Sequence, residues 1–277
     1  MRTLVRGTVS RILMRSSHAS ALALAAVAAL SLTACGSGSD AEPAASGGGS
    51  LSTISSGTLT VCTNPPYEPF EYQENGTTVG FDMDLAKAVA DDAGLKLNIL
   101  NVGFETMDSG IALATQCDIA ASGITINDTR KAKMDFSTPY LDDDLVLMAN
   151  KNSGIASIDD AKNGKKVGVQ QATTGESWAK QNGITPVSFK DVGLQIQAVA
   201  AGTNDAALGN QSVLLFAAKD NADLVKVADI PTGEKLGIAV KKDNAPMLEA
   251  VNKTLKRLED SGEMLKLKQK YFGSDVK

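Results

Sequence analysis

The chain has almost no histidine. Among its 277 residues there is one, His18, and it lies in an N-terminal segment that we expect to be removed from the mature protein. The mature chain would then carry no imidazole, which excludes a Ser–His or Cys–His catalytic pair and a histidine metal site. We therefore expect a protein that is not an enzyme and that holds no metal and no cofactor.

Basic tracts and long apolar runs are also missing after residue 50. Of the 27 basic residues, four are arginines of the N-terminal segment, so 23 would remain against 32 acidic residues, a formal charge of about −9. This acidic balance does not favour nucleic acid as a partner. No apolar stretch after residue 50 is long enough to cross a bilayer.

The N-terminus has the pattern of an export signal. Residues 19–30 form an apolar run that is too short to span a membrane, and the segment that follows, Leu32-Thr-Ala-Cys35, resembles the lipobox of bacterial lipoproteins. The alternative is an ordinary signal peptide with a chance cysteine. We expect residues 1–34 to be a lipoprotein signal peptide and residues 35–50 to be the lipidated Cys35 with a flexible Gly/Ser/Ala-rich tether. The positive residues of the leader are Arg2, Arg6, Arg11 and Arg15.

Two further cysteines, Cys62 and Cys117, each lie in a strand-like run. Outside the membrane the redox environment permits a disulfide, and neighbouring strands could bring the two within bridging distance. The alternative is two buried free thiols. We predict the disulfide.

The rest of the chain alternates short apolar runs with amphipathic stretches, a pattern typical of α/β proteins with mostly parallel sheets. Apolar residues at spacings of three and four also predict a helix near the C-terminus, beginning near Pro246 and ending near Gly262. The other predicted helices are 82–93, 105–114, 174–181, 192–201 and 211–220. The predicted strands are 59–62, 95–100, 118–121, 166–170, 186–190, 205–208 and 236–241.

The segment from Ser122 to Arg130 predicts an anion site. Small and hydroxyl residues stand where a strand would end, which is where α/β sheets bind ligands, and one arginine follows about a helical turn later. Backbone N–H groups and the Ser122 and Thr125 hydroxyls can point at a carboxylate, and the planar Arg130 guanidinium matches its two oxygens. The alternative is a strand–turn–helix with a solvated arginine.

Two other segments could line the same cleft. The proline-rich loop 64–70 can hold Tyr67 at a fixed angle, and Phe104 precedes a predicted helix. Hydroxyl residues Thr173 and Thr174 precede another helix, whose free N–H groups could take a carboxylate. The alternatives are aromatic packing in the core and ordinary helix capping.

The order of these motifs resembles a known family. Gly80-Phe-Asp-Met-Asp-Leu-x3-Val-Ala is similar to the signature of the family 3 (polar amino acid) extracellular solute-binding proteins of ABC importers. The resemblance runs from about Leu59 to Phe272 and includes the Pro-Pro-Tyr-Glu-Pro-Phe loop and the final Lys-Tyr-Phe.

The resemblance implies a type II periplasmic-binding-protein-like fold, with two α/β lobes joined by two hinge crossovers. Lobe one would comprise residues 51–147 and 238–277, and lobe two residues 148–237, with crossovers near 148–150 and 237–240. We expect a monomer, lipid-anchored through Cys35 at the outer face of the cytoplasmic membrane, as the lipobox indicates. This protein would capture a small amino acid or related carboxylate and deliver it to an ABC transporter permease.

The resemblance also implies a set of ligand contacts. Arg130 corresponds to the arginine that clamps the α-carboxylate. The aromatic rings that sandwich the ligand side chain correspond to Tyr67 and Phe104. The residues that contact the ligand's backbone groups correspond to Ser122, Gly123 and Thr125. The loop of lobe two that completes the carboxylate site corresponds to Thr173 and Thr174.

Two positions depart from the family pattern. Asn64 stands where lysine- and histidine-binding relatives carry an aspartate, which argues against a basic side chain on the ligand. Asn210 stands where many relatives carry the aspartate that pairs with the α-ammonium, and a neutral amide supplies no opposite charge. Either another acid takes over this role or the ligand lacks a free α-amino group. The sequence does not identify the solute or the permease.

Two rival functions follow from the same scaffold. An enzyme similar to cyclohexadienyl dehydratases would use Glu176 as general acid or base, and turnover of a cyclohexadienyl acid would reveal it. A solute-sensing input protein would hand its bound form to a separate receptor.

Overall fold

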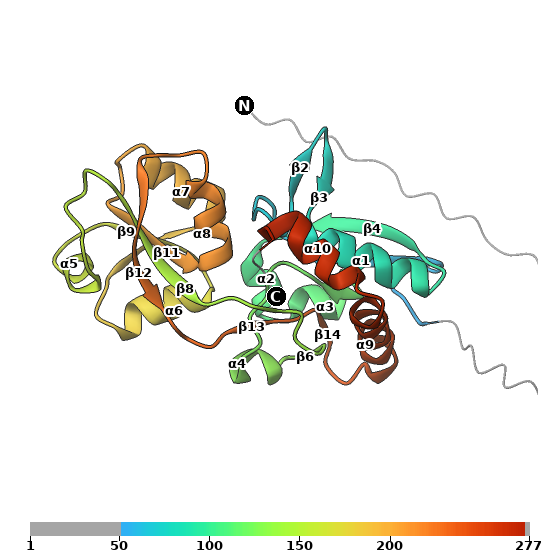
Figure 1. The fold of residues 1–277 in the computed structure, drawn as a ribbon. Coiled ribbons are helices and arrows are strands. Elements are labelled where there is room, and N and C mark those ends of the chain that lie inside the picture. Colours follow the sequence, from blue (N-terminus) through green and yellow to red (C-terminus); the bar gives the residue numbers. More distant parts are fainter. Residues whose placement is uncertain (1–50, 275–277) are drawn as a thin grey trace, which may run out of the picture. The chain divides into compact units, whose positions relative to one another are not determined.

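The computed structural model describes residues 51–274. The predictions made for residues 1–50, including the signal peptide, the lipidated Cys35 and the tether, lie outside the described residues. The described chain folds around two five-stranded sheets, each with its own helices (Figure 1).

The first sheet has the strand order β4-β1-β5-β14-β6. Strand β1 pairs in parallel with both β4 and β5, whereas β14 runs antiparallel to its neighbours β5 and β6. We call this sheet and the helices packed on it lobe one. Its strands are β1 (Thr58–Thr63), β4 (Lys96–Asn101), β5 (Ile119–Ala120), β6 (Met134–Phe136) and β14 (Ala239–Lys241).

The second sheet, in lobe two, has the order β10-β9-β11-β8-β12. Strand β9 pairs in parallel with β10 and β11, and β8 runs antiparallel to β11 and β12. Its strands are β8 (Leu145–Asn150), β9 (Val167–Gln170), β10 (Pro186–Phe189), β11 (Ala206–Asn210) and β12 (Leu224–Ile230).

In each sheet, four strands run in one direction and one runs against them. The reversed strand is the one that has just arrived from the other lobe, β8 in lobe two and β14 in lobe one. This arrangement confirms the predicted α/β class with mostly parallel sheets and two crossovers between lobes.

The two crossover segments pair with each other. Strand β7 (Leu141–Asp142) on the outgoing segment is antiparallel to β13 (Lys235–Leu236) on the returning one. Both crossovers lie a few residues earlier than expected. All six residues of β8 are buried within the second sheet, so the expected boundary after residue 147 would cut through this strand.

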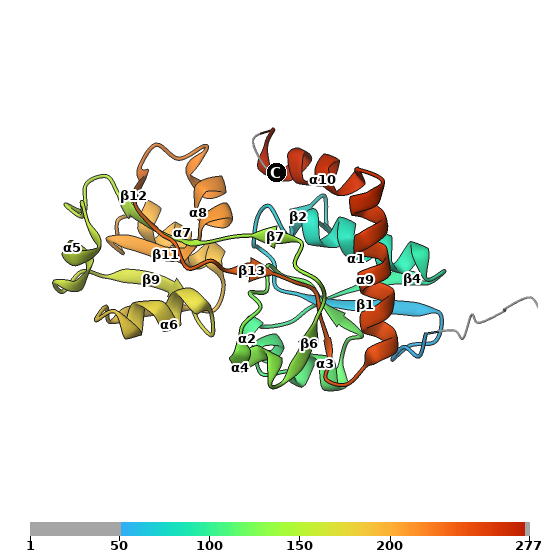
Figure 2. The ribbon, with the colours of Figure 1, turned by 60° about the horizontal axis from the view of Figure 1, so that its bottom comes forward.

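Side chains of lobe one alternate between the two faces of its sheet, as the two-residue period of a strand requires. Leu59 and Val61 pack with α1, α9 and α10, whereas Cys62 packs with α2 and α3 on the other face (Figure 2). The helices are α1 (Phe81–Asp92), α2 (Phe104–Asp108), α3 (Ile111–Thr115), α4 (Asp128–Lys131), α9 (Ala245–Asp260) and α10 (Glu263–Phe272).

Lobe two repeats this layering. Helix α6 covers one face of its sheet, and α7 and α8 cover the other (Figure 2). The helices of this lobe are α5 (Ile158–Lys162), α6 (Thr174–Gln181), α7 (Val192–Ala200) and α8 (Gln211–Ala218).

A small hairpin in lobe one, β2 (Tyr72–Glu74) and β3 (Thr77–Val79), turns at Asn75-Gly76, both with positive φ as a tight hairpin requires.

Two predicted elements are split by glycines. The helix expected over 105–114 is two short helices, because Gly110 adopts the left-handed conformation with φ of 80° between them. The strand expected over 236–241 is divided at Gly237 into β13 and β14. A Cβ at Gly237 would lie 2.8 Å from the end of the Ile126 side chain, so a larger residue there would require that side chain to move.

The structure contains the predicted disulfide. Cys62 in β1 and Cys117, just before β5, are joined, with their Cα atoms 5.7 Å apart. Both residues are buried beside α2 and α3. The bond therefore fastens the chain just before β5, the strand that leads into the Ser122 loop, to the first strand of the sheet.

Two buried carboxyl groups hold that loop from behind. The Ser122 hydroxyl donates to Glu71, and the Gly123 N–H donates to Asp82 Oδ2 at 2.7 Å. Both acids are fully buried. Burial raises the pKa of Asp82 from 3.8 to about 7 and raises the pKa of Glu71 well above its ordinary value, with the Asp82 charge adding to the latter. The loop is thus anchored to groups that favour their neutral form.

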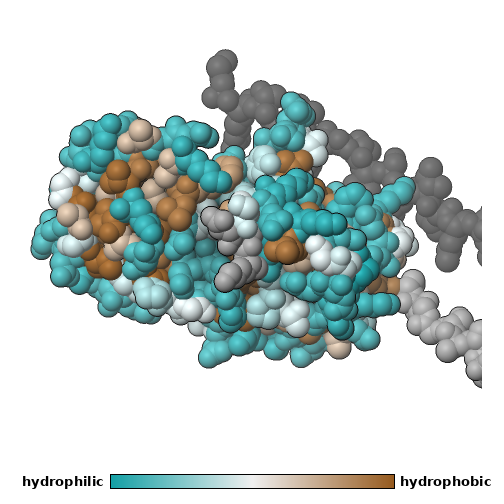
Figure 3. All heavy atoms as spheres, viewed as in Figure 1, coloured by the Kyte–Doolittle hydropathy of each residue, from teal (hydrophilic) through white to brown (hydrophobic). Residues whose placement is uncertain are grey.

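In residues 51–274 no helix combines the length and hydrophobicity needed to cross a membrane. The face shown in Figure 3 is largely hydrophilic over lobe one, and hydrophobic residues gather over the sheet of lobe two.

The disulfide predicts a stability effect. Replacing both cysteines by alanine removes a cross-link between residues 55 apart in sequence. We expect the free energy of unfolding to fall by roughly 2–4 kcal/mol, measured by urea denaturation. The reduced wild-type protein should show a similar loss. A change below about 0.5 kcal/mol would contradict a stabilising role.

The buried acids predict a pH dependence. Because the pKa of Asp82 is higher in the folded protein, the folded state binds more protons than the unfolded state between pH 3.8 and about 7, so stability falls as pH rises through this window. Asparagine mimics the neutral acid, so Asp82→Asn should flatten this decline in urea denaturation series. The control is Asp91→Asn, which changes an exposed residue of the same helix and should leave the decline unchanged. An equal decline in D82N and wild type would refute the assignment.

Candidate ligand-binding site

A short helix after β5 places Arg130. Asn127 caps α4, accepting a 2.9 Å hydrogen bond from the Arg130 N–H through its side-chain oxygen. An asparagine at this position favours a helix start because it satisfies a backbone donor that the helix itself leaves free. The cap fixes the direction in which the arginine leaves the backbone.

The guanidinium of Arg130 is buried, with 2% of the residue exposed. Nε donates to Asp108 Oδ1 at 2.9 Å, one Nη donates to the Thr125 carbonyl at 2.9 Å and the other to the Ala172 carbonyl of lobe two at 3.2 Å. Its carbon lies 5.3 Å from the centroid of the Phe104 ring. These bonds use three of the five guanidinium N–H groups, so two donors remain for another acceptor.

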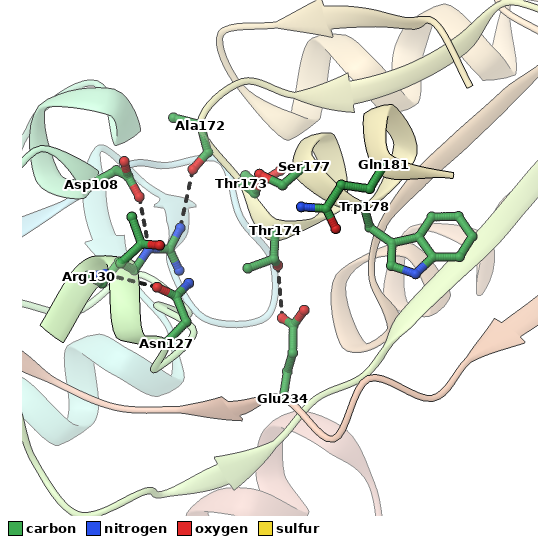
Figure 4. Close-up of a pocket in the computed structure, with 11 residues that line it drawn as sticks. Asp108, Asn127, Arg130, Ala172, Thr173, Thr174, Ser177, Trp178, Gln181 and Glu234 are labelled. Atoms are coloured by element: carbon green, nitrogen blue, oxygen red, sulfur yellow. Dashed lines mark hydrogen bonds and ion pairs between the residues drawn. The ribbon is translucent and has the colours of Figure 1, made fainter. Parts of the chain in front are cut away.

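Arg130 lines a pocket of about 390 Å³ to which both lobes contribute (Figure 4). Lobe one supplies α4 and the end of α2, lobe two supplies one face of α6 along its whole length, and the returning crossover supplies Glu234. Of the predicted contacts, Arg130, Thr173 and Thr174 lie here. The other lining residues are Asp108, Asn127, Thr129, Ala172, Ser177, Trp178, Gln181 and Glu234, which the sequence analysis missed.

The N-terminus of α6 faces this pocket. Thr173 is its N-cap: the hydroxyl accepts from the Glu176 N–H at 3.2 Å and donates to the Gln170 carbonyl at 2.7 Å. The N–H groups at the start of a helix have no partner within the helix. Those of Thr174 and Gly175 are therefore suited to an anion in the pocket.

Glu234 connects the two lobes at this pocket. Its Oε2 accepts hydrogen bonds from the Thr125 hydroxyl of lobe one and from the Thr174 hydroxyl of lobe two, each at 2.8 Å. Two hydroxyls predicted to meet a ligand thus meet a carboxylate of the chain itself.

Tyr67 and Asn210 form a second contact between the lobes. The Tyr67 hydroxyl donates to Asn210 Oδ1 at 2.9 Å, and the Asn210 amide donates to the Asp143 carbonyl at 3.3 Å. Burial raises the pKa of Tyr67 well above 10.0, and the Asp143 charge adds to the effect. The cavity lined by Tyr67, Thr173 and Asn210 measures only about 10 Å³, so protein groups fill this part of the site.

Asn64 also spans the lobes. Its side-chain oxygen accepts from Gln170 Nε2 at 2.9 Å, and its amide donates to the Val102 carbonyl at 2.9 Å. Asn64 therefore serves as a neutral hydrogen-bonding group between the two lobes.

Three predicted contacts are used differently from what was expected. Phe104 packs against the Arg130 guanidinium, a contact that the sequence did not predict. The Ser122 hydroxyl and the Gly123 N–H are engaged by Glu71 and Asp82 inside lobe one. A Cβ at Gly123 would lie 2.6 Å from the Tyr67 ring, so the glycine permits close packing of that aromatic.

Asp143 is the acid beside Asn210. Its two oxygens accept hydrogen bonds from Ser212, from the N–H at 3.0 Å and from the hydroxyl at 2.6 Å. Burial raises the pKa of Asp143 to about 7 in spite of these bonds, and the Glu234 charge contributes in the same direction. Asp143 therefore caps the start of α8 and is committed to that role.

Glu176, the candidate catalytic acid, is also held by hydrogen bonds from other groups of the protein. Partial burial would raise its pKa, but hydrogen bonds from Ser188, Lys180 and the Ala172 N–H outweigh it, and the pKa is lowered from 4.5. The Ser188 hydroxyl lies 2.6 Å and the Lys180 ammonium 2.9 Å from its Oε1. Within residues 51–274 no cluster of three or more histidines, cysteines or acids is arranged to hold a metal.

Comparison with known proteins gives consistent matches. A family model described as bacterial extracellular solute-binding proteins, family 3, matches residues 59–274. The arginine-binding extracellular protein ArtP of Bacillus subtilis (strain 168) is 35% identical over 234 residues, covering 81% of this chain and 91% of that protein.

Solved structures agree. An ancestral arginine-binding protein bound to arginine has a TM-score of 0.72 and 37% identity, with 78% of this chain and 99% of that chain covered. The ancestral amino acid-binding protein AncCDT-1, described as a precursor of cyclohexadienyl dehydratase, has a TM-score of 0.71 and 34% identity, with 78% and 95% covered. On the fold, the site and these matches together, the chain belongs to the bacterial extracellular solute-binding proteins, family 3.

Proposed function

We propose that this protein captures a small amino acid or related carboxylate outside the cytoplasmic membrane and delivers it to the permease of an ABC transporter. One observation carries the proposal. A buried guanidinium, two of whose N–H groups have no partner among residues 51–274, faces a polar pocket that both lobes and a crossover build together.

Capture would begin at Arg130. The solute carboxylate accepts from the two remaining guanidinium N–H groups and from the N–H groups that open α6. Because Arg130 itself is buried, these charge-assisted bonds are stronger than at a surface, and a buried charge left without a partner is costly. The same physics disfavours solutes that have no carboxylate.

The relatives support the amino acid class. ArtP is named for arginine, and the ancestral structure holds arginine. Asn64 and Asn210 bring no charge to the site, so any cationic group of the solute must find its counter-charge elsewhere in the pocket.

Delivery requires that the protein stay near its transporter. Cys35, followed by a tether rich in glycine and serine, would hold a monomeric binding domain at the outer face of the cytoplasmic membrane.

Enzymatic activity is the weaker alternative. AncCDT-1 shows that the scaffold is related to a dehydratase. In this chain, however, the candidate acid Glu176 is held in its ionised form by three hydrogen-bond donors, which suits capping better than proton donation.

Removing the guanidinium should abolish tight capture. A thermal-shift screen of amino acids and small carboxylates identifies the best-binding solute, and titration calorimetry then measures its affinity. For Arg130→Ala we expect a loss of more than tenfold, about 1.4 kcal/mol, and for Arg130→Lys a smaller loss, because lysine keeps the charge without the planar fork.

The matched control is Arg257→Ala, the other arginine of the described residues, which pairs with Asp92 and Glu263 on the surface of lobe one. It should bind as the wild type does. Unchanged affinity in R130A, with the fold intact by circular dichroism, would remove the basis of the proposal.

The anchor is tested separately. Cys35→Ser cannot accept a diacylglycerol thioether, so the protein should move from the membrane fraction to the medium or soluble fraction and lose metabolic labelling by an alkyne fatty acid. Retention of label or of membrane association in this variant would argue against lipidation at Cys35.

A further inference from the structure

The carboxylate of Glu234 is aimed into the pocket. The residue lies on the returning crossover between β12 and β13, and two hydroxyls, one from each lobe, hold its Oε2 at 2.8 Å. Figure 4 shows the side chain rising from the crossover toward Thr174, on the side of the pocket where Trp178 and Gln181 lie. Because both of these hydrogen bonds go to Oε2, the second carboxylate oxygen, Oε1, can accept a hydrogen bond from a bound molecule.

Glu234 has no cationic partner in the part of the chain that the structure describes. Its hydrogen bonds come from neutral hydroxyls, whereas the nearby Asp108 is paired with Arg130 at 2.9 Å and with Lys133 at 3.5 Å. The pocket therefore contains one cation, Arg130, and two carboxylates. Its lining carries an excess of one negative charge.

That excess bears on which solute fits. A solute carrying only a carboxylate would satisfy Arg130 but would bring a second anion close to Glu234 and shield it from water. Desolvating an unpaired carboxylate is costly. A solute with a cationic group as well would pair with Glu234 and remove this cost.

Among the acids that the structure describes, the other candidates for this contact are less available. Asp143 receives two hydrogen bonds from Ser212 and is buried against the start of α8. Glu71 and Asp82 are fully buried behind the Ser122 loop. Glu234 is half-buried and lines the pocket itself.

We propose that Glu234 determines the charge of the solute, supplying the anionic contact that Asn210 does not provide and selecting acids that also carry an ammonium or guanidinium group. This inference rests on the proposed function, since it concerns the same pocket. The indole of Trp178 lines that pocket too and offers an aromatic face suited to such a cation.

The test uses probes that differ in one charge. L-Arginine is compared with L-citrulline, which replaces the guanidinium by a neutral urea, and with Nα-acetyl-L-arginine, which removes the α-ammonium. L-Lysine and L-glutamine form a second cationic and neutral pair. Affinities of the full-length protein and of Glu234→Gln are measured by titration calorimetry.

We expect the wild type to prefer the cationic member of at least one pair by tenfold or more. In E234Q this preference should shrink at least fivefold, with the affinity for the neutral member unchanged or increased. The exposed Glu249→Gln on α9 makes the same charge change away from the pocket and should retain the preference.

The outcomes separate this inference from the function on which it rests. Binding of neutral acids but not cationic ones, or an undiminished preference in E234Q, overturns the role of Glu234 and leaves capture at Arg130 standing. Equal losses for both members of all three pairs in E234Q, the arginine and Nα-acetyl-arginine pair included, also overturn it, because they indicate a purely structural role. If no acid of either kind binds, both proposals fail.

Discussion

A guanidinium with almost no access to water is the constraint on which this site depends. Arg130 cannot lose its charge, so its burial is tolerated only with acceptors around it. Asp108 supplies the opposite charge and the carbonyls of Thr125 and Ala172 supply two more acceptors, one from each lobe. These partners satisfy part of the donor set. The guanidinium N–H groups that remain suit a carboxylate, and the start of α6 brings further N–H groups to the same place.

The architecture explains why the site lies where it does. Each lobe is a sheet whose strands end near the other lobe, and the chain crosses between them twice through segments that pair as β7 and β13. Polar groups at those ends come from distant parts of the sequence and meet in hydrogen bonds such as Tyr67 to Asn210 and Asn64 to Gln170. A crossover residue, Glu234, then lies between the lobes and contacts hydroxyls of both. The pocket is therefore a product of the topology and not of one local motif.

The sequence was sufficient for features with a local cause. Periodic apolar residues predicted α9, the paired cysteines predicted a disulfide, and the hydroxyls before α6 predicted a helix start that Thr173 does cap. It failed where tertiary contacts decide. Strands β8 and β12 were missed, and Asp108 and Glu234 carry no signal of their own in the sequence, because only the folded chain brings them to Arg130 and to the two threonines. Ser122 and Gly123 were correctly placed on the loop, but their bonds to buried acids could not be foreseen from spacing.

The central claim is that Arg130 receives the carboxylate of the solute. A crystal structure of the protein with the solute that gives the largest thermal shift tests it most directly. The account predicts a solute carboxylate oxygen about 3 Å from a guanidinium nitrogen of Arg130, with the α6 N-terminus contributing to the same group. A bound solute whose carboxylate lies elsewhere, with Arg130 contacting protein groups alone, would contradict it.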